Sequence, residues 1–102
     1  MPETYILDGT IPVPVSLLTW ARWLETAECH VSATWVTPDV RVSTVFLGLD
    51  HQWGDGPPLL FETLCFGGAC DGMTERYSTW EAAEQGHQAM VAQIREALQL
   101  AP

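Results

Sequence analysis

Lysine is absent from this sequence of 102 residues, and four arginines are its only strong cations. Thirteen aspartate and glutamate residues give a formal net charge of −9. So acidic a surface repels phosphate groups, and we therefore expect no direct binding of DNA or RNA. The same charge favours a partner protein with a basic surface. Alternatively, the negative net charge keeps a small protein soluble.

The sequence also has no long apolar run and little cysteine. No stretch reaches the roughly 18 to 20 apolar residues of a membrane span, and the acidic start MPETYILDG lacks the basic segment of a secretion signal. Three cysteines, Cys29, Cys65 and Cys70, have spacings that match neither a zinc site nor a disulfide framework. We expect a cytoplasmic protein, without membrane contact, in which the cysteines pack as small hydrophobic residues.

Apolar residues make up 47% of the chain, enough for one compact domain over residues 1–102. Alternating or β-branched segments predict strands at residues 4–9, 29–36, 40–49, 59–67 and 73–78. The segment IPVPV, residues 11–15, is expected to be an extended connection, because proline cannot donate a hydrogen bond within a sheet.

Two segments have the periodicity of amphipathic helices. After Ser16, a predicted N-cap, the segment LLTWARWLETAE forms a short apolar stripe. Ser78 and Glu81 predict a capping box that opens a longer helix. The apolar stripe of this second helix consists of Trp80, Ala83, His87, Met90, Val91, Ile94 and Leu98. The predicted fold is α+β, a single-layer antiparallel sheet of four to five strands with the short N-terminal helix and the long C-terminal helix packed on one face.

The two central strands predict one core face and one unusual outer face. The core face is formed by Val40, Val42, Thr44, Phe46, Leu59, Phe61, Thr63 and Cys65, with Trp35 and Trp80 also assigned to the core. The outer face combines Arg41, Ser43, Leu49, Leu60 and Glu62 with an apolar group of Val45, Leu47, Leu64 and Phe66. Such a patch indicates contact with another chain, unless the long loop after residue 49 folds over it.

That loop, residues 50–58, contains Asp50, His51 and Asp55, which are groups suited to metal binding or general base catalysis. No further ligand or orienting partner accompanies them, and Asp-Gly-Pro-Pro is ordinary turn chemistry, so we favour a structural turn. His87 is interpreted as a hydrogen-bonded histidine in the helix stripe. The sequence has no known catalytic motif, and we expect no enzyme activity, cofactor or metal.

Several acidic and aromatic residues are candidates for partner binding. Glu25 and Glu28 end the first predicted helix, where the helix dipole disfavours negative charge. Acids in turns would collect at the rims of the sheet, where carboxylates roughly 6 to 7 Å apart approximate the spacing of phosphates. The predicted partner-binding residues are Glu25, Glu28, Asp39, Asp50, Asp55, Glu62, Asp71, Trp20, Trp23, Trp53, Leu64 and Phe66.

The segments VSTVFLGLDH, GPPLLFETLCFGG and RYSTWEAAEQGH, preceded by PVPVSLLTWARWLE, resemble a family of small proteins of bacteriophages and prophages. The resemblance covers nearly the whole chain, but its residues belong to strands, turns and a helix cap, so it assigns no catalytic residue. It implies a setting in the host cell cytoplasm in which small acidic proteins inhibit host defence enzymes, as anti-CRISPR proteins do.

The leading hypothesis is therefore an anti-CRISPR-like inhibitor that binds the basic nucleic-acid-binding surface of a host defence effector, such as a Cas subunit, and blocks access of nucleic acid. One alternative is a phage housekeeping or assembly protein that self-associates as a homodimer through the outer sheet face. Another is a small metal-binding protein that uses Asp50, His51 and Asp55.

Overall fold

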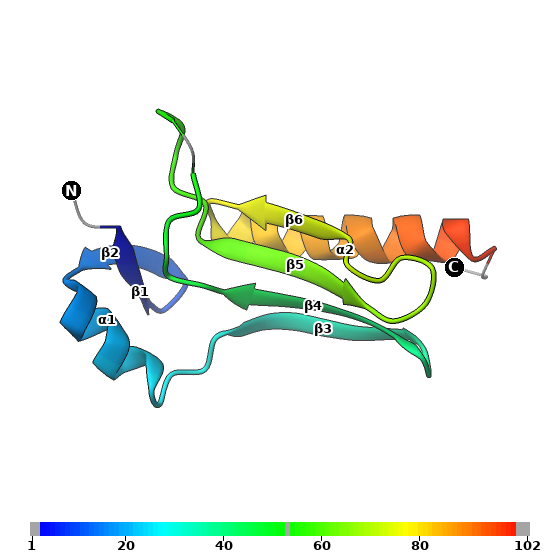
Figure 1. The fold of residues 1–102 in the computed structure, drawn as a ribbon, viewed down its shortest axis with the longest axis horizontal. Coiled ribbons are helices and arrows are strands. Elements are labelled where there is room, and N and C mark those ends of the chain that lie inside the picture. Colours follow the sequence, from blue (N-terminus) through cyan, green and yellow to red (C-terminus); the bar gives the residue numbers. More distant parts are fainter. Residues whose placement is uncertain (1–2, 53, 100–102) are drawn as a thin grey trace.

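The computed structural model describes residues 3–52 and 54–99, which form two antiparallel sheets and two helices (Figure 1). The elements are β1 (Thr4–Asp8), β2 (Ile11–Val15), α1 (Leu17–Leu24), β3 (His30–Thr37), β4 (Val40–Phe46), β5 (Phe61–Phe66), β6 (Thr74–Tyr77) and α2 (Trp80–Ala97). Strands β3 to β6 form a meander in sequence order, and β1 and β2 form a separate hairpin. The α+β class is thus confirmed. Neither described helix is long and apolar enough to cross a membrane.

The main core lies between α2 and one face of the four-stranded sheet. Helix α2 contacts all four strands, and Figure 1 shows it behind the sheet. The buried apolar residues include Val40, Val42, Phe46, Phe61 and Cys65 of the sheet and Ala83, Met90 and Ile94 of α2. These residues belong to the core face and the helical stripe predicted from the sequence, so the period of two in the strands and the three- and four-residue steps in the helix identified this interface correctly.

The start of α2 differs slightly from the prediction. Thr79 is the N-cap, with its hydroxyl accepting a hydrogen bond from the backbone N–H of Ala82 at 3.1 Å. The predicted capping box at Ser78 and Glu81 is therefore wrong by one residue. Thr79 has the extended backbone conformation that an N-cap requires, and a threonine hydroxyl caps as a serine does.

The segment IPVPV forms strand β2, which corrects the prediction of an unpaired connection. Pro14 lies opposite Tyr5 and Pro12 opposite Leu7 in the register with β1. The backbone N–H of Tyr5 donates to the carbonyl of Gly48 at 2.7 Å and so points away from β2. Because hydrogen bonding alternates along an antiparallel pair, both prolines occupy positions where β1 needs no donor.

Helix α1 packs beside β1, away from α2, so the prediction of both helices on one face of a single sheet is wrong (Figure 1). Its predicted apolar stripe is largely exposed, with Leu17 at 65% and Leu18 at 62%. Trp23 alone among its residues packs against a core cluster, with its ring 5.7 Å from that of Phe46 in an edge arrangement. The small β1–β2 hairpin offers α1 too little apolar surface to cover the stripe.

Strand β3 turns Trp35 outward, which corrects its assignment to the core, since 65% of this residue is exposed. The side of β3 that carries Ser32, Thr34 and Val36 faces α2 instead. The hydroxyl of Thr34 bonds to Nε2 of His87 at 2.8 Å, and the hydroxyl of Thr44 bonds to Nδ1 at 2.7 Å. A buried imidazole needs partners for both ring nitrogens, and this requirement places Thr34 inward and Trp35 outward.

Candidate binding surface

The face of the four-stranded sheet opposite α2 is the candidate functional surface, and we call it the open face. Residues directly opposite one another in the register share a face, which defines its members. They are His30, Ala33 and Trp35 of β3, Arg41, Ser43 and Val45 of β4, Glu62, Leu64 and Phe66 of β5, and Thr74 and Arg76 of β6. Of the residues assigned to this face from the sequence, three are wrong. Leu60 is 1% exposed and belongs to a core cluster, and Leu47 and Leu49 lie beyond the end of β4.

At one end of the open face, next to the turn between β3 and β4, lies a row of three side chains, Trp35, Arg41 and Phe66, which are opposite one another on adjacent strands. The Arg41 guanidinium carbon is 5.8 Å from the centroid of the Trp35 ring and 4.9 Å from that of Phe66. Both distances are within the range of cation–π attraction, about 0.5 to 1 kcal/mol each at exposed sites. The Arg41 guanidinium thus contacts both aromatic rings in the free chain, and Phe66 remains 42% exposed.

The open face carries a net positive charge, whereas the whole chain is negative. Glu62 and Arg76 form an ion pair of 3.1 Å on β5 and β6, which cancels one charge of each sign. Arg41 then remains as a net positive charge. No carboxylate among the described residues lies within ion-pair distance of its guanidinium. The predicted contact residues Glu62, Leu64 and Phe66 are thus brought together on one face.

Two more predicted residues, Asp39 and Asp71, lie in the turns at the end of the sheet that carries this row. Asp39 is in the turn between β3 and β4. The Asp71 carboxylate accepts a hydrogen bond of 2.7 Å from the N–H of Gly67, just after β5. Gly67 has φ of +91°, and a β-carbon there would overlap the carbonyl oxygen of Asp39, so the two turns are adjacent. Both acids are exposed and flank the open face.

The remaining predicted acids lie in other parts of the molecule. The Asp50 carboxylate accepts from the N–H groups of Gln52 at 2.8 Å and Leu59 at 3.0 Å, so it shapes the loop that also contains Asp55. Glu25 is the C-cap residue of α1. Glu28 accepts a 2.9 Å hydrogen bond from the backbone of His30, and this bond lowers the pKa of the Glu28 carboxyl. These carboxylates therefore form no continuous acidic surface with Asp39 and Asp71.

Two of the predicted tryptophan anchors, Trp20 and Trp23, are also separate from the open face. Trp20 is half-buried, and its indole lies where a β-carbon on Gly48 would stand; Gly48 has φ of +74°. Trp23 packs on the core through Phe46. Trp53 lies outside the described residues. Trp20 and Trp23 thus join α1 to the rest of the fold.

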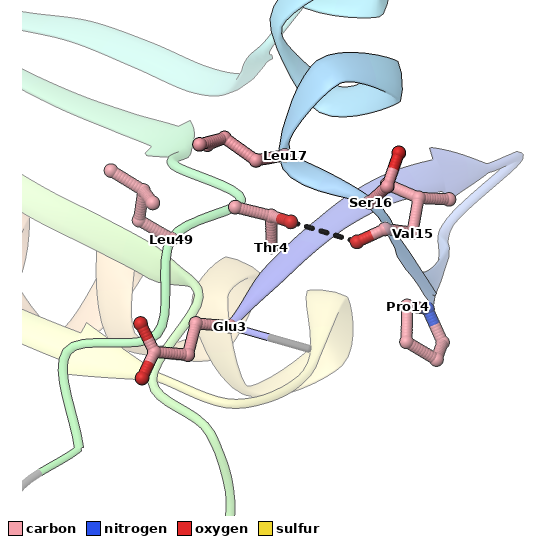
Figure 2. Close-up of a pocket in the computed structure, with 7 residues that line it drawn as sticks. All are labelled: Glu3, Thr4, Pro14, Val15, Ser16, Leu17 and Leu49. Carbon is pink, nitrogen blue, oxygen red and sulfur yellow. Dashed lines mark hydrogen bonds between the residues drawn. The ribbon is translucent and has the colours of Figure 1, made fainter. Parts of the chain in front are cut away.

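A hollow of about 540 Å³ lies between the hairpin and the start of α1, and Figure 2 shows its lining. Leu17 and Leu49 form an apolar side, and the Glu3 carboxylate lies at the other side. The Thr4 hydroxyl donates to the carbonyl of Val15 at 2.8 Å and is therefore already used. The hollow lacks the convergent polar groups that orient a small-molecule ligand.

Within residues 3–52 and 54–99, no three metal-binding side chains come close enough to hold an ion. Asp50 and His51 line a shallow hollow with Glu3 and Gln52. His87 is 3% exposed, and burial lowers the pKa of its imidazole. Burial also raises the pKa of the Cys65 thiol, which keeps it protonated. These geometries present no assembled catalytic group.

Comparison of the chain with family models, with curated proteins and with solved structures finds no match. The role of the candidate surface is therefore inferred from the structure of this chain alone.

The contributions of Trp35 and Ala33 to this surface were not predicted from the sequence, and neither was the role of Arg41. The signal that could have found them is His87. A histidine in an apolar helix stripe needs hydroxyl partners on the facing strands, and Thr34 is the β3 residue that supplies one. Once Thr34 faces inward, alternation places Trp35 beside Arg41.

Proposed function

We propose that this protein acts by binding another protein through the open face, with Trp35, Arg41 and Phe66 at the centre of the contact. The observation that carries the proposal is the row that these side chains form, with Trp35 and Phe66 exposed, on a sheet face that neither described helix covers. Tryptophan and arginine are the residues most often found at energetic centres of protein interfaces. Holding them in place before binding reduces the entropy lost on association.

We propose a basic, nucleic-acid-binding protein of a host defence system as the partner, which the small protein inhibits. The net charge of −9 supports this proposal through long-range attraction, and Asp39 and Asp71, in the turns at the end of the sheet that carries the row, offset the single positive charge of Arg41. The outer surfaces of the Trp35 and Phe66 rings can accept cationic side chains of the partner. The resemblance to phage proteins supplies the biological setting of a defence inhibitor.

The test is affinity capture from a host that carries defence systems, with the captured protein identified, purified and titrated in a calorimeter. Substitution Phe66→Ala is expected to weaken binding about 30-fold, corresponding to about 2 kcal/mol at an interface centre. Raising the salt concentration to about 0.5 M should weaken it further, because the Debye length then falls well below 8 Å. The bound partner should also lose affinity for its nucleic acid.

The matched control is Leu17→Ala, which removes an apolar side chain on α1, away from the open face, that is as exposed as Trp35. This variant should bind as the unmodified protein does. If Leu17→Ala abolishes capture while Phe66→Ala and Trp35→Ala have no effect, the open face is not the binding surface and the proposal is wrong.

A further inference from the structure

The two edges of the four-stranded sheet differ in a way that points to a second interaction surface. Edge strands expose unpaired backbone groups, and soluble proteins protect them by keeping the strand short or by placing charges on it. Strand β6 is protected in both ways, because it has four residues and includes Glu75 and Arg76. Strand β3 has eight residues, HVSATWVT, without one carboxylate, lysine or arginine. In Figure 1 it forms the free lower edge of the sheet.

The hydrogen bonds at the end of β4 show which backbone groups of this strand point toward β3. The N–H of Phe46 donates to the carbonyl of Cys29, on the side of β3, at 2.8 Å. The N–H of Leu47 donates to the carbonyl of Leu60, on the side of β5, at 2.7 Å. Because the direction alternates along an antiparallel strand, Val42 and Thr44 also point toward β3.

The register then identifies the free groups of β3. Thr44 lies opposite Ser32 and Val42 lies opposite Thr34, so Ser32 and Thr34 direct their backbone groups toward β4. The N–H and C=O groups of Ala33 and Trp35 consequently point away from the sheet. Irregularities in register before and after residues 32–35 leave this stretch as the regular part of the edge.

We propose that β3 pairs with β3 of a second copy of this chain, in antiparallel orientation, with the two-fold axis at Thr34. In this register Ala33 of each copy lies opposite Trp35 of the other, and the four outward backbone groups of one copy meet the four of the other. The small Ala33 side chain leaves room for the exposed indole of the second copy. The two four-stranded sheets become one continuous sheet with the two open faces on the same side.

The charge pattern favours a second copy over a different protein at this edge. A two-fold interface places each strand against itself, so any charge near the axis would be close to its own copy and would be destabilising. Strand β3 satisfies this requirement, whereas β4, β5 and β6 each contain a charged residue. This proposal uses backbone groups at the edge and does not depend on the function proposed for the open face.

Sedimentation velocity of the full chain, from micromolar to near-millimolar concentrations, tests the proposal and should show a monomer–dimer equilibrium. Ala33→Pro removes an outward N–H, which the single chain does not use, and is expected to weaken dimerisation at least about tenfold. The control Thr74→Pro removes a backbone N–H from β6, the other edge strand. Tyr77 and Glu75 pair with Phe61 and Thr63 of β5, so by alternation the N–H of Thr74 points away from the sheet. This variant should leave the dimer intact. Circular dichroism checks that both variants remain folded.

Backbone hydrogen exchange provides a second readout that needs no substitution. The amides of Ala33 and Trp35 should exchange at least about tenfold more slowly at dimer-forming concentrations than in the monomer, because pairing protects them. A chain that stays monomeric throughout would overturn the proposal. So would a dimer lost on Leu64→Glu of the open face but kept on Ala33→Pro. Phe66→Ala should weaken partner binding and leave the dimer unchanged, so the two proposals can fail separately.

Discussion

The ring of Tyr77 at the end of β6 lies directly against Gly86 of α2. A β-carbon built on Gly86 would overlap the Cζ and hydroxyl oxygen of Tyr77. The glycine therefore lets the last strand and the helix that follows it approach closely, and the buried Tyr77 hydroxyl lies in this contact. Glycine within a helix is otherwise unfavourable by about 1 kcal/mol relative to alanine.

Gly86→Ala should accordingly destabilise the protein by about 1 to 3 kcal/mol, since overpacking outweighs the gain in helix propensity. Urea unfolding measures the change. In a Tyr77→Ala background the same substitution should become stabilising by up to about 1 kcal/mol, because the ring no longer occupies the space. Stabilisation of the unmodified chain by Gly86→Ala would show that the two elements do not pack as described.

The buried His87 should make stability depend on pH. Burial lowers the pKa of the folded imidazole below its ordinary value of 6.5. As the pH falls below about 6.5, the unfolded chain takes up a proton that the folded chain does not, so the free energy of unfolding decreases. The slope reaches at most about 1.4 kcal/mol per pH unit for this one group.

Urea unfolding at about pH 7.5 and about pH 5.5 measures this loss, and His87→Gln should reduce the difference between the two values. His30→Gln changes an exposed histidine and should preserve the difference. Glu28, whose folded pKa is lowered, contributes stability above its ordinary pKa of 4.5 that is lost below it, outside this window. Equal slopes for the unmodified chain and His87→Gln would contradict the prediction.

Ile94 and Leu17 belong to apolar helix stripes that look alike in sequence, but their contributions to the free energy of unfolding should differ greatly. Ile94 is fully buried beneath the sheet, whereas Leu17 is 65% exposed. Ile94→Ala should destabilise the protein by about 2 to 5 kcal/mol, and Leu17→Ala by no more than about 0.5 kcal/mol. Denaturant unfolding compares them directly. Equal losses would mean that the α1 stripe is covered in solution.

The four-stranded meander was predicted well from the sequence where the strand and the helix in contact both have a regular pattern of apolar residues. Val42 and Phe46 alternate with polar residues, and Met90 and Ile94 recur at helical spacing, so each element identifies the face that it buries. Such local periodicity follows from backbone geometry and does not depend on distant parts of the chain. The α+β class and the central hairpin were therefore accessible from the sequence.

The tertiary structure decided the parts that local patterns leave ambiguous. Strand β3 has apolar and hydroxyl residues in both sets of alternate positions, and the contacts of Thr34 with His87 and of Val36 with the core place this side inward and Trp35 outward. Pro14 can enter a strand because its missing donor faces away from β1, a condition set by pairing and not by composition. The amino-acid sequence fixed the chemistry of these side chains, but the long-range contacts determined which of them face solvent and form the binding surface.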